Sequence, residues 1–289
     1  MKTKYIILTL LLIILAVLIN TNKKSDLVIK ALKTPFIQNN YINKKGLTVS
    51  TRVLIPNGYK RTQYSKNSFQ EYLRNYKLKP AGSKVINYDG SEYFYQSGHV
   101  GVLEMPVPKN GLQQCADALI RLRAEYLWDN HQQDKIGFKF TSGHYVSWKK
   151  YASGIHPKIN GNKVTFSNKA KADYSKPNFY KYLTLINMYA GTLSLYTELP
   201  KVKDNKIQLG DLLVNPGTPG HIVIIMDEIV NEKGEKLFLL AQGNTPSQTM
   251  HLLKNSMDTN TSPWIKLKNN QVIDIPAYRF ENSKFIRFK

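Results

Sequence analysis

The pattern of apolar and polar residues begins with one long apolar run near the N-terminus. Residues 5–19 carry no charge, and two lysines precede them. A short basic segment followed by an apolar run is typical of an export signal, and this run is short for a full membrane span. Polar, lysine-rich sequence follows it. We therefore expect a signal peptide or membrane anchor over 1–21, a linker over 22–46 and a single domain over 47–289.

Helical spacing is clearest over residues 112–128. Apolar side chains recur there every three or four positions: Cys115, Ala118, Leu119, Leu122 and Tyr126. This spacing predicts a helix that packs one side into a core and carries Cys115 in its first turn. A shorter helix is expected over 68–76, where Ser68 and Glu71 form a capping pattern, and a second long helix over 178–196.

Strand patterns dominate the last third of the chain. Strands are predicted over 211–214, 221–230 and 236–242, with a hairpin turn at 231–234. Strands are also predicted over 51–56 and 136–140, and a strand with a turn at Asp89-Gly90 over 84–95. Weaker strand patterns occupy 250–253 and 271–280. Helices that precede an antiparallel sheet indicate an α+β fold.

The chain is strongly basic, with a formal net charge of +21. Such a surface attracts polyanions, including nucleic acid, anionic lipid and acidic wall polymers. The lysines and arginines are scattered, however, and no run of them exceeds two residues. We therefore do not expect a nucleic-acid partner.

Cys115 is the only cysteine in the chain. An exported protein with one cysteine cannot form an intramolecular disulfide, so its thiol is either buried or functional. A helix N-terminus lowers the pKa of a cysteine through its dipole and its free N–H groups. The predicted position thus favours Cys115 as a nucleophile. The alternative is a small residue buried in the core.

A thiol nucleophile needs a base, and His221 is the best candidate among six histidines. It follows a turn rich in proline and glycine and opens the apolar run 222–226, so rigid backbone should hold it. The other five lie in polar or loop-like sequence and are expected to be solvated: His99, His131, His144, His156 and His251.

A third group should orient the base. If Val230 pairs with Glu235 across the hairpin, two polar side chains of the second strand share the face of the histidine: Gln242 and Asn244. A register shift of one residue would turn Gln242 to the opposite face. His251 is a further alternative for this role.

Acyl transfer also requires donors for the oxyanion. The backbone N–H of Cys115 at the helix start is one, and the side-chain amide of Gln113 or Gln114 is a second.

Part of the chain resembles the NlpC/P60 and CHAP families of papain-like cell-wall amidases and peptidases. Gln114-Cys115 resembles the CHAP nucleophile motif, and the segments 210–213 and 220–225 resemble the Gly-Asp and Gly-His strands of these families. Gln242-x-Asn244 resembles the CHAP Glu-x-Asn, with glutamine in place of the charged residue that would stabilise an imidazolium. The resemblance covers 113–245 and implies a papain-like fold and a cell-wall peptide substrate.

A closer resemblance, over nearly all of 47–289, is to a bacterial family known as domain of unknown function 4846. Five strings carry it: 112–118 (LQQCADA), 121–127 (RLRAEYL), 189–195 (YAGTLSL), 239–242 (LLAQ) and Pro263-Trp264. This second resemblance implies no activity.

These patterns predict a cysteine hydrolase, of amidase or endopeptidase type, in the cell envelope. It would be periplasmic or anchored to the membrane through its N-terminal segment, and it would cut a cell-wall peptide or another amide without a metal or organic cofactor. Two alternatives remain. One is a catalytically inactive module of the same fold that binds an envelope ligand, and the other is a thiol acyltransferase.

Overall fold

The computed structural model describes residues 41–289, so the predicted segment 1–21 and most of the predicted linker lie outside the described residues. The last residues assigned to the linker already pack on the domain. The Leu54 N–H donates to the Tyr41 carbonyl at 2.9 Å, and Ile42 pairs with Val53. Within 41–289, no helix has both the length and the apolar character needed to cross a bilayer.

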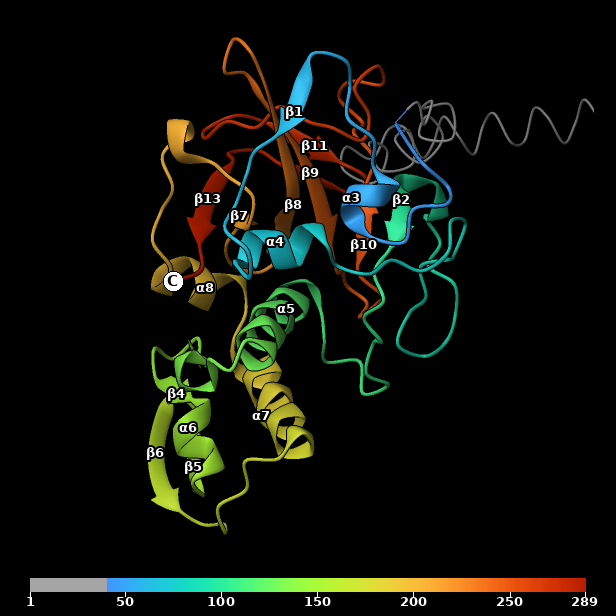
Figure 1. The fold of residues 1–289 in the computed structure, drawn as a ribbon. Helices are drawn as coiled ribbons and strands as arrows, with labels where there is room; N and C mark the ends of the chain where they lie inside the picture. Colours follow the sequence, from blue (N-terminus) through green and yellow to red (C-terminus); the bar gives the residue numbers. More distant parts are fainter. Residues whose placement is uncertain (1–40) are drawn as a thin grey trace, which may run out of the picture.

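The structure is a mixed α+β fold built on one antiparallel sheet, as the order of predicted elements indicated (Figure 1). The strands run in the order β13-β7-β8-β9-β10-β2, and β1 pairs with the far end of the long strand β8. Their bounds are β1 (Tyr59–Arg61), β2 (His99–Val102), β7 (Asp211–Asn215), β8 (His221–Asn231), β9 (Lys236–Gln242), β10 (His251–Leu253) and β13 (Lys284–Arg287).

Three two-stranded sheets lie outside the main sheet. They are β3 (Gly137–Lys139) with β4 (Tyr145–Ser147), β5 (Ile155–Asn160) with β6 (Lys163–Asn168), and β11 (Ile273–Ile275) with β12 (Tyr278–Phe280). The sequence patterns did not predict the β5–β6 hairpin, because most of its residues are polar or only partly buried and lack an apolar face.

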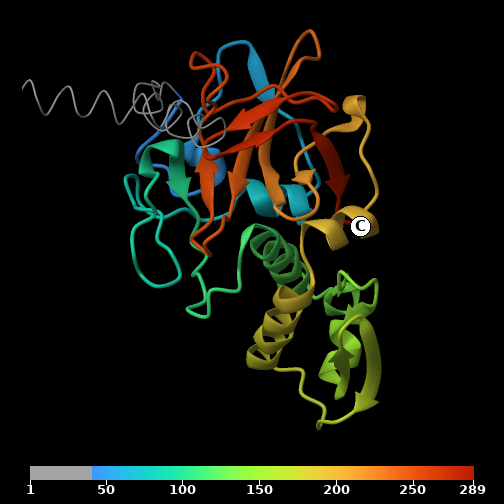
Figure 2. The same ribbon diagram turned by 180° about the vertical axis from the view of Figure 1, so that it is seen from behind.

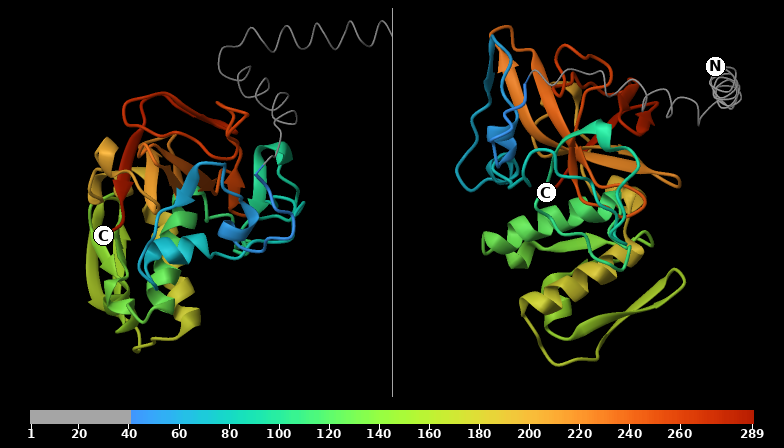
Figure 3. Two further views of the ribbon diagram at one scale, coloured as in Figure 1. Left: turned by 45° about the horizontal axis from the view of Figure 1, so that its top comes forward. Right: turned by 90° about the vertical axis from the view of Figure 1, so that its right-hand side faces the viewer.

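Helices cover one face of the sheet and extend away from it (Figure 2, Figure 3). They are α3 (Val49–Arg52), α4 (Phe69–Arg74), α5 (Cys115–Asp129), α6 (Trp148–Ala152), α7 (Lys176–Tyr189) and α8 (Thr192–Glu198), with short 3₁₀ turns η2 (Gln96–Gly98), η3 (Gln133–Lys135) and η4 (Asp204–Lys206). Helix α5 contacts β8 and β9 on one side and α7 on the other. It is therefore buried on more than the one side that its apolar spacing predicted.

Two predicted elements are wrong in a way that local chemistry explains. Residues 51–56 read as a strand because they are β-branched and apolar, but α3 ends there instead, and the Thr48 hydroxyl caps it by accepting the Thr51 N–H. The predicted helix 178–196 is interrupted after Tyr189. The backbone is extended at Gly191, whose N–H donates to the Ser194 hydroxyl at 2.9 Å, and α8 begins anew.

Candidate active site

Cys115 is the first residue of α5, which confirms its predicted position in the first turn. The Asp117 carboxylate closes that turn by accepting the Gln114 N–H at 2.9 Å. The residue after β9 approaches this turn closely: a Cβ on Gly243 would lie 3.0 Å from the Cβ of Ala118 and 3.7 Å from the Cα of Cys115. A glycine here lets the end of the sheet pack directly on the start of the helix.

The β8–β9 hairpin does not have the predicted register at its turn. Val230 pairs with Lys236 rather than with Glu235. A bulge between Ile225 and Asp227 then shifts the pairing by one residue, so that Ile224 lies opposite Ala241, as the prediction required. The bulge thus restores the predicted register at the end of the hairpin that carries His221 and Gln242.

A chain of hydrogen bonds runs from His221 into the sheet. Nε2 of His221 lies 2.8 Å from Oε1 of Gln242, and Nε2 of Gln242 lies 3.2 Å from Nε2 of His251. Nδ1 of His251 lies 3.1 Å from the carbonyl oxygen of Thr249. All three side chains are buried.

The chemistry of these groups gives the chain one direction. A carbonyl oxygen only accepts, so Nδ1 of His251 donates to Thr249, and Nε2 of a neutral His251 accepts. The amide nitrogen of Gln242 donates to that acceptor, and its oxygen accepts from Nε2 of His221. The proton of His221 is therefore on Nε2, which leaves a lone pair on Nδ1. This is the tautomer that a general base requires.

Burial keeps both histidine rings neutral, and the hydrogen bonds just described require neutral rings. It lowers the pKa of His221 to about 4, although the hydrogen bond to Gln242 acts in the opposite direction. Burial, and after it the neighbouring His99, lowers the pKa of His251 to about 3. Both histidines therefore carry no charge at neutral pH.

The prediction of a lowered thiol pKa is wrong. Burial, and next the nearby Asp117, raises the pKa of Cys115 to about 11. The backbone N–H groups of Ala116, Ile222 and Cys115 itself act in the opposite direction and are outweighed. Cys115 is only 7% exposed, and desolvation of its thiol outweighs the effect of the helix N-terminus. The folded protein holds Cys115 as a neutral thiol in the same pocket as the neutral imidazole of His221.

We expect iodoacetamide to alkylate Cys115 slowly at pH 7 and about tenfold faster for each pH unit up to roughly pH 10, because only the thiolate reacts. His221→Ala should change the rate at pH 7 little, since a neutral ring does not stabilise a thiolate. The measurement is the alkylation rate of the folded protein against pH, with free cysteine as the control. A plateau that is reached by pH 8 would contradict a raised pKa.

Cys115 and His221 line one pocket of about 670 Å³. Tyr278 of β12 also lines it, and its ring centroid lies 4.6 Å from that of His221. Among residues 41–289, no hydrogen bond joins the Cys115 sulfur to the His221 ring, whose one such bond is to Gln242. Loose geometry of this kind is common in sites without substrate.

The remaining candidate residues differ in their hydrogen-bond partners and in whether they line the pocket. Gln242, and not Asn244, bonds to His221, whereas the Asn244 amide donates to the Tyr93 hydroxyl at 3.4 Å. Gln113 is buried away from the pocket and accepts from Arg121 at 2.9 Å. Gln114 lines the pocket. Its Oε1 accepts from the Thr245 hydroxyl at 3.1 Å, which leaves the NH₂ end as the available donor.

Of the other five histidines, which were expected to be solvated, only His131 is exposed. His99, His144 and His156 are half-buried, and His251 is 3% exposed. His251 lies in the short strand β10, between β9 and β2. Three residues are too few to show alternation, so its place inside the sheet had no sequence signal. Tyr278 and Asn187 also line the pocket, and the sequence patterns missed them because long-range packing brings them there.

The loop before His221 depends on a glycine. A Cβ on Gly220 would overlap the carbonyl oxygen of Gly217 and the hydroxyl of Thr192, whereas a Cβ on Gly191, at φ −179°, would meet nothing within 4 Å. We expect Gly220→Ala to lower the free energy of unfolding by about 1–3 kcal/mol and to displace His221. Gly191→Ala is the matched control, and it should cost less, because it removes only a favourable N-cap glycine of α8 and creates no overlap. Urea denaturation of both variants measures the difference, and equal stabilities would refute the role of Gly220.

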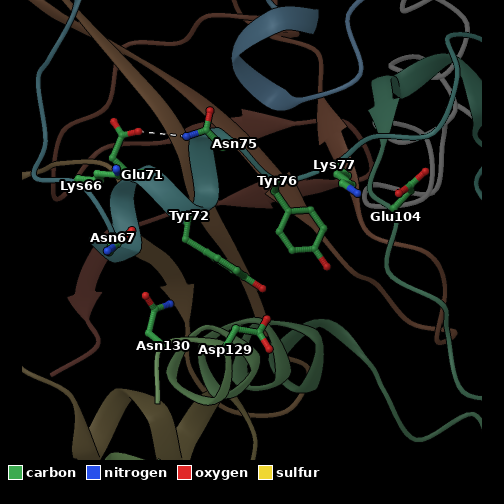
Figure 4. A pocket seen from close by; sticks show the side chains of 10 residues that line it. All are labelled: Lys66, Asn67, Glu71, Tyr72, Asn75, Tyr76, Lys77, Glu104, Asp129 and Asn130. Atoms are coloured by element: carbon green, nitrogen blue, oxygen red, sulfur yellow. Dashed lines mark hydrogen bonds between the residues drawn. The ribbon is translucent and has the colours of Figure 1, made fainter. Parts of the chain in front are cut away.

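A second pocket of similar volume lies between α4 and the end of α5 (Figure 4). Tyr72 extends across it towards Asp129, and the ring of Tyr76 lies beside that of Tyr72. Neither cysteine nor histidine lines it, so it does not offer a thiol and an imidazole. In residues 41–289, no group of three or more histidine, cysteine, aspartate and glutamate side chains is arranged to hold a metal ion.

Comparison with known proteins gives one match. The profile of a family described as a domain of unknown function (4846) matches residues 49–287. Neither the curated proteins nor the solved structures contain a significant match to this chain. The match spans nearly all of the described residues, and the chain belongs to the domain of unknown function 4846 family.

Proposed function

We propose that the protein is a cysteine hydrolase that cleaves an amide bond in a peptide of the cell envelope. The observation that carries the proposal is the hydrogen-bond chain from Thr249 to His221. It leaves a lone pair on Nδ1 of His221, and this residue lines the same pocket as the single thiol of the chain. A buried chain with every donor matched to an acceptor is a precise way to hold one tautomer.

The reaction starts from the neutral pair. As the sulfur of Cys115 attacks the carbonyl carbon, its proton passes to Nδ1 of His221, and the carbonyl oxygen becomes an oxyanion. The imidazolium then gives that proton to the leaving amine, and a thioester remains on Cys115. Water, deprotonated by His221, hydrolyses the thioester and restores the thiol. Throughout the reaction, the side-chain oxygen of Gln242 accepts a hydrogen bond from Nε2 of His221, and the amide dipole stabilises the imidazolium.

The backbone N–H of Cys115 and the amide NH₂ of Gln114 are the proposed oxyanion donors. Both belong to the start of α5, and Gln114 lines the pocket. The Thr245 hydroxyl holds the other end of the Gln114 amide, which fixes the direction of its NH₂ group. Preorganised donors of this kind are often the largest single contribution to acyl transfer.

We also propose that the fold is papain-like. The support is the chain order: a nucleophile at the start of α5, then the base at the start of β8 and its orienting residue at the end of β9. Export, a cell-envelope location and a membrane contact through the N-terminal segment remain proposals that depend on the sequence of residues 1–21.

The test is digestion of purified peptidoglycan, with new amino groups counted over time. We expect the wild type to release them, and Cys115→Ala and His221→Ala to release none above background. A thioester on Cys115, seen as a mass adduct at early times, would support covalent catalysis. Release by Cys115→Ala at the wild-type rate would refute the proposal, provided that thermal melting shows both proteins folded.

The raised pKa of Cys115 favours a second candidate, a module that binds an envelope ligand without cleaving it. In that case the Cys115 thiol is a buried part of the pocket lining and not a nucleophile. A thiol that labels only in denaturant, together with binding of peptidoglycan fragments without product, would select the binding module over the hydrolase.

A further inference from the structure

The pocket at Cys115 has an unusual charge for this chain. The whole protein has 41 lysines and arginines, yet none lines this pocket. Asp117 is the one carboxylate among its lining residues. An anionic ligand would therefore find no positive side chain in the pocket wall. A cationic ligand would find Asp117, whose pKa burial raises to about 7, and would favour its ionised form.

Two oxygens at the pocket lack a hydrogen-bond partner. Asp117 is 5% exposed, and one of its carboxylate oxygens caps the helix by accepting the Gln114 N–H. Its other oxygen, Oδ1, is buried and accepts from no group. Asn187 of α7 also lines the pocket, and its Oδ1 is likewise buried without a donor. Asp117 lies in the first turn of α5 and Asn187 in the last turn of α7, two helices that are in contact, and both residues line this pocket.

Buried acceptors in proteins normally have donors, and a buried carboxylate normally has a positive partner. Here the pocket wall supplies neither. A ligand that brings several N–H donors and a positive charge would match these acceptors. A protonated amine has these properties, because an ammonium group carries up to three donors and no acceptor.

We propose that Asp117 and Asn187 form a subsite for a protonated amine on the substrate. The proposal rests on the hydrolase function and names its substrate class: amides that carry a free amino group near the bond to be cut. The Asp117 carboxyl lies near enough to the Cys115 thiol to raise its pKa, and both residues line this pocket, so an amine held there shares the pocket with the attacking sulfur. Substrates with a blocked amine would leave both oxygens unpaired and the carboxylate uncompensated.

The experiment measures binding without turnover, on the full chain carrying Cys115→Ala. The probes are alaninamide and N-acetylalaninamide, which differ in the charged amine. We expect alaninamide to bind at least about tenfold more tightly, measured by calorimetry or by NMR titration. Adding Asp117→Asn should remove this preference. The matched control is Asp129→Asn, at the far end of α5, which should retain it.

Because Asp117→Asn could also weaken the cap of α5, a second variant changes the charge of the pocket without altering the cap. Asn187→Asp adds a carboxylate without touching the cap and should increase the preference for alaninamide. Equal binding of the two probes, with no effect of Asp117→Asn or Asn187→Asp, would overturn the subsite. Peptidoglycan hydrolysis by the wild type alongside that result would leave the hydrolase proposal intact. The amine preference without any hydrolysis would support the subsite and refute the hydrolase.

Discussion

Gln242→Glu should raise the pKa of His221 by about 1–3 units above its present value of about 4. The glutamate oxygen would accept the Nε2 proton of His221 as the glutamine oxygen does, but with a full negative charge. An opposite charge at hydrogen-bond distance favours the imidazolium, and the buried setting weakens screening by water. The same substitution would restore the acidic residue of the motif that this sequence resembles.

The substitution also acts on His251. In the wild type, the Gln242 amide donates to Nε2 of His251, but a carboxylate has no proton to give. Two acceptors would then face each other unless His251 takes up a proton. Because Nδ1 of His251 already donates to Thr249, the new proton must go to Nε2. The pKa of His251 should therefore rise as well.

NMR titration of the histidine ring protons measures both shifts. Asn244→Asp is the matched control, since it adds a carboxylate beside the pocket at a residue that bonds to Tyr93 rather than to His221. It should shift the pKa of His221 less. An unchanged His221 pKa in Gln242→Glu would show that the hydrogen bond to residue 242 is absent in solution.

His251→Phe should slow hydrolysis on the order of a hundredfold or more with little change in KM, because it leaves His221 in the wrong tautomer. Phenylalanine preserves the ring but removes the acceptor for the Gln242 amide. A buried N–H without an acceptor costs about 1–3 kcal/mol. Rotation of the Gln242 amide reduces that cost, because it leaves the amide oxygen unpaired instead, and an unpaired carbonyl is better tolerated than an unpaired N–H. The rotated amide would present its NH₂ to Nε2 of His221, so the proton of His221 would move to Nδ1, the nitrogen needed as a base.

Nitrogen chemical shifts of the His221 ring report this change directly, which a purely structural role of His251 would not produce. His251→Gln is the conservative variant, because its Oε1 can replace the lost acceptor, and it should recover much of the rate. If His251→Phe kept both the wild-type rate and a protonated Nε2 on His221, the positioning role of His251 would be wrong.

Local sequence determined the elements that carry the site. The helical spacing from Cys115, the strand that opens at His221 and the return strand that ends at Gln242 are all present where the patterns predicted them. Each depends on periodicity and turn residues within about 20 positions, the range over which such signals operate. The predicted pairing of the hairpin was wrong at its turn and correct at the site, because a bulge that no pattern signalled compensates for the error.

Tertiary structure decided the chemistry of these residues. Sequence placed Cys115 at a helix N-terminus and therefore predicted a reactive thiolate, but the sheet and α7 bury that turn, and desolvation raises the pKa of the thiol. Sequence also left Gln242, Asn244 and His251 as alternatives for orienting His221. Long-range pairing of β9 with β10 joined two of them into one chain. Desolvation and hydrogen-bond direction depend on neighbours distant in sequence, so periodicity could predict where the residues lie but not how they ionise.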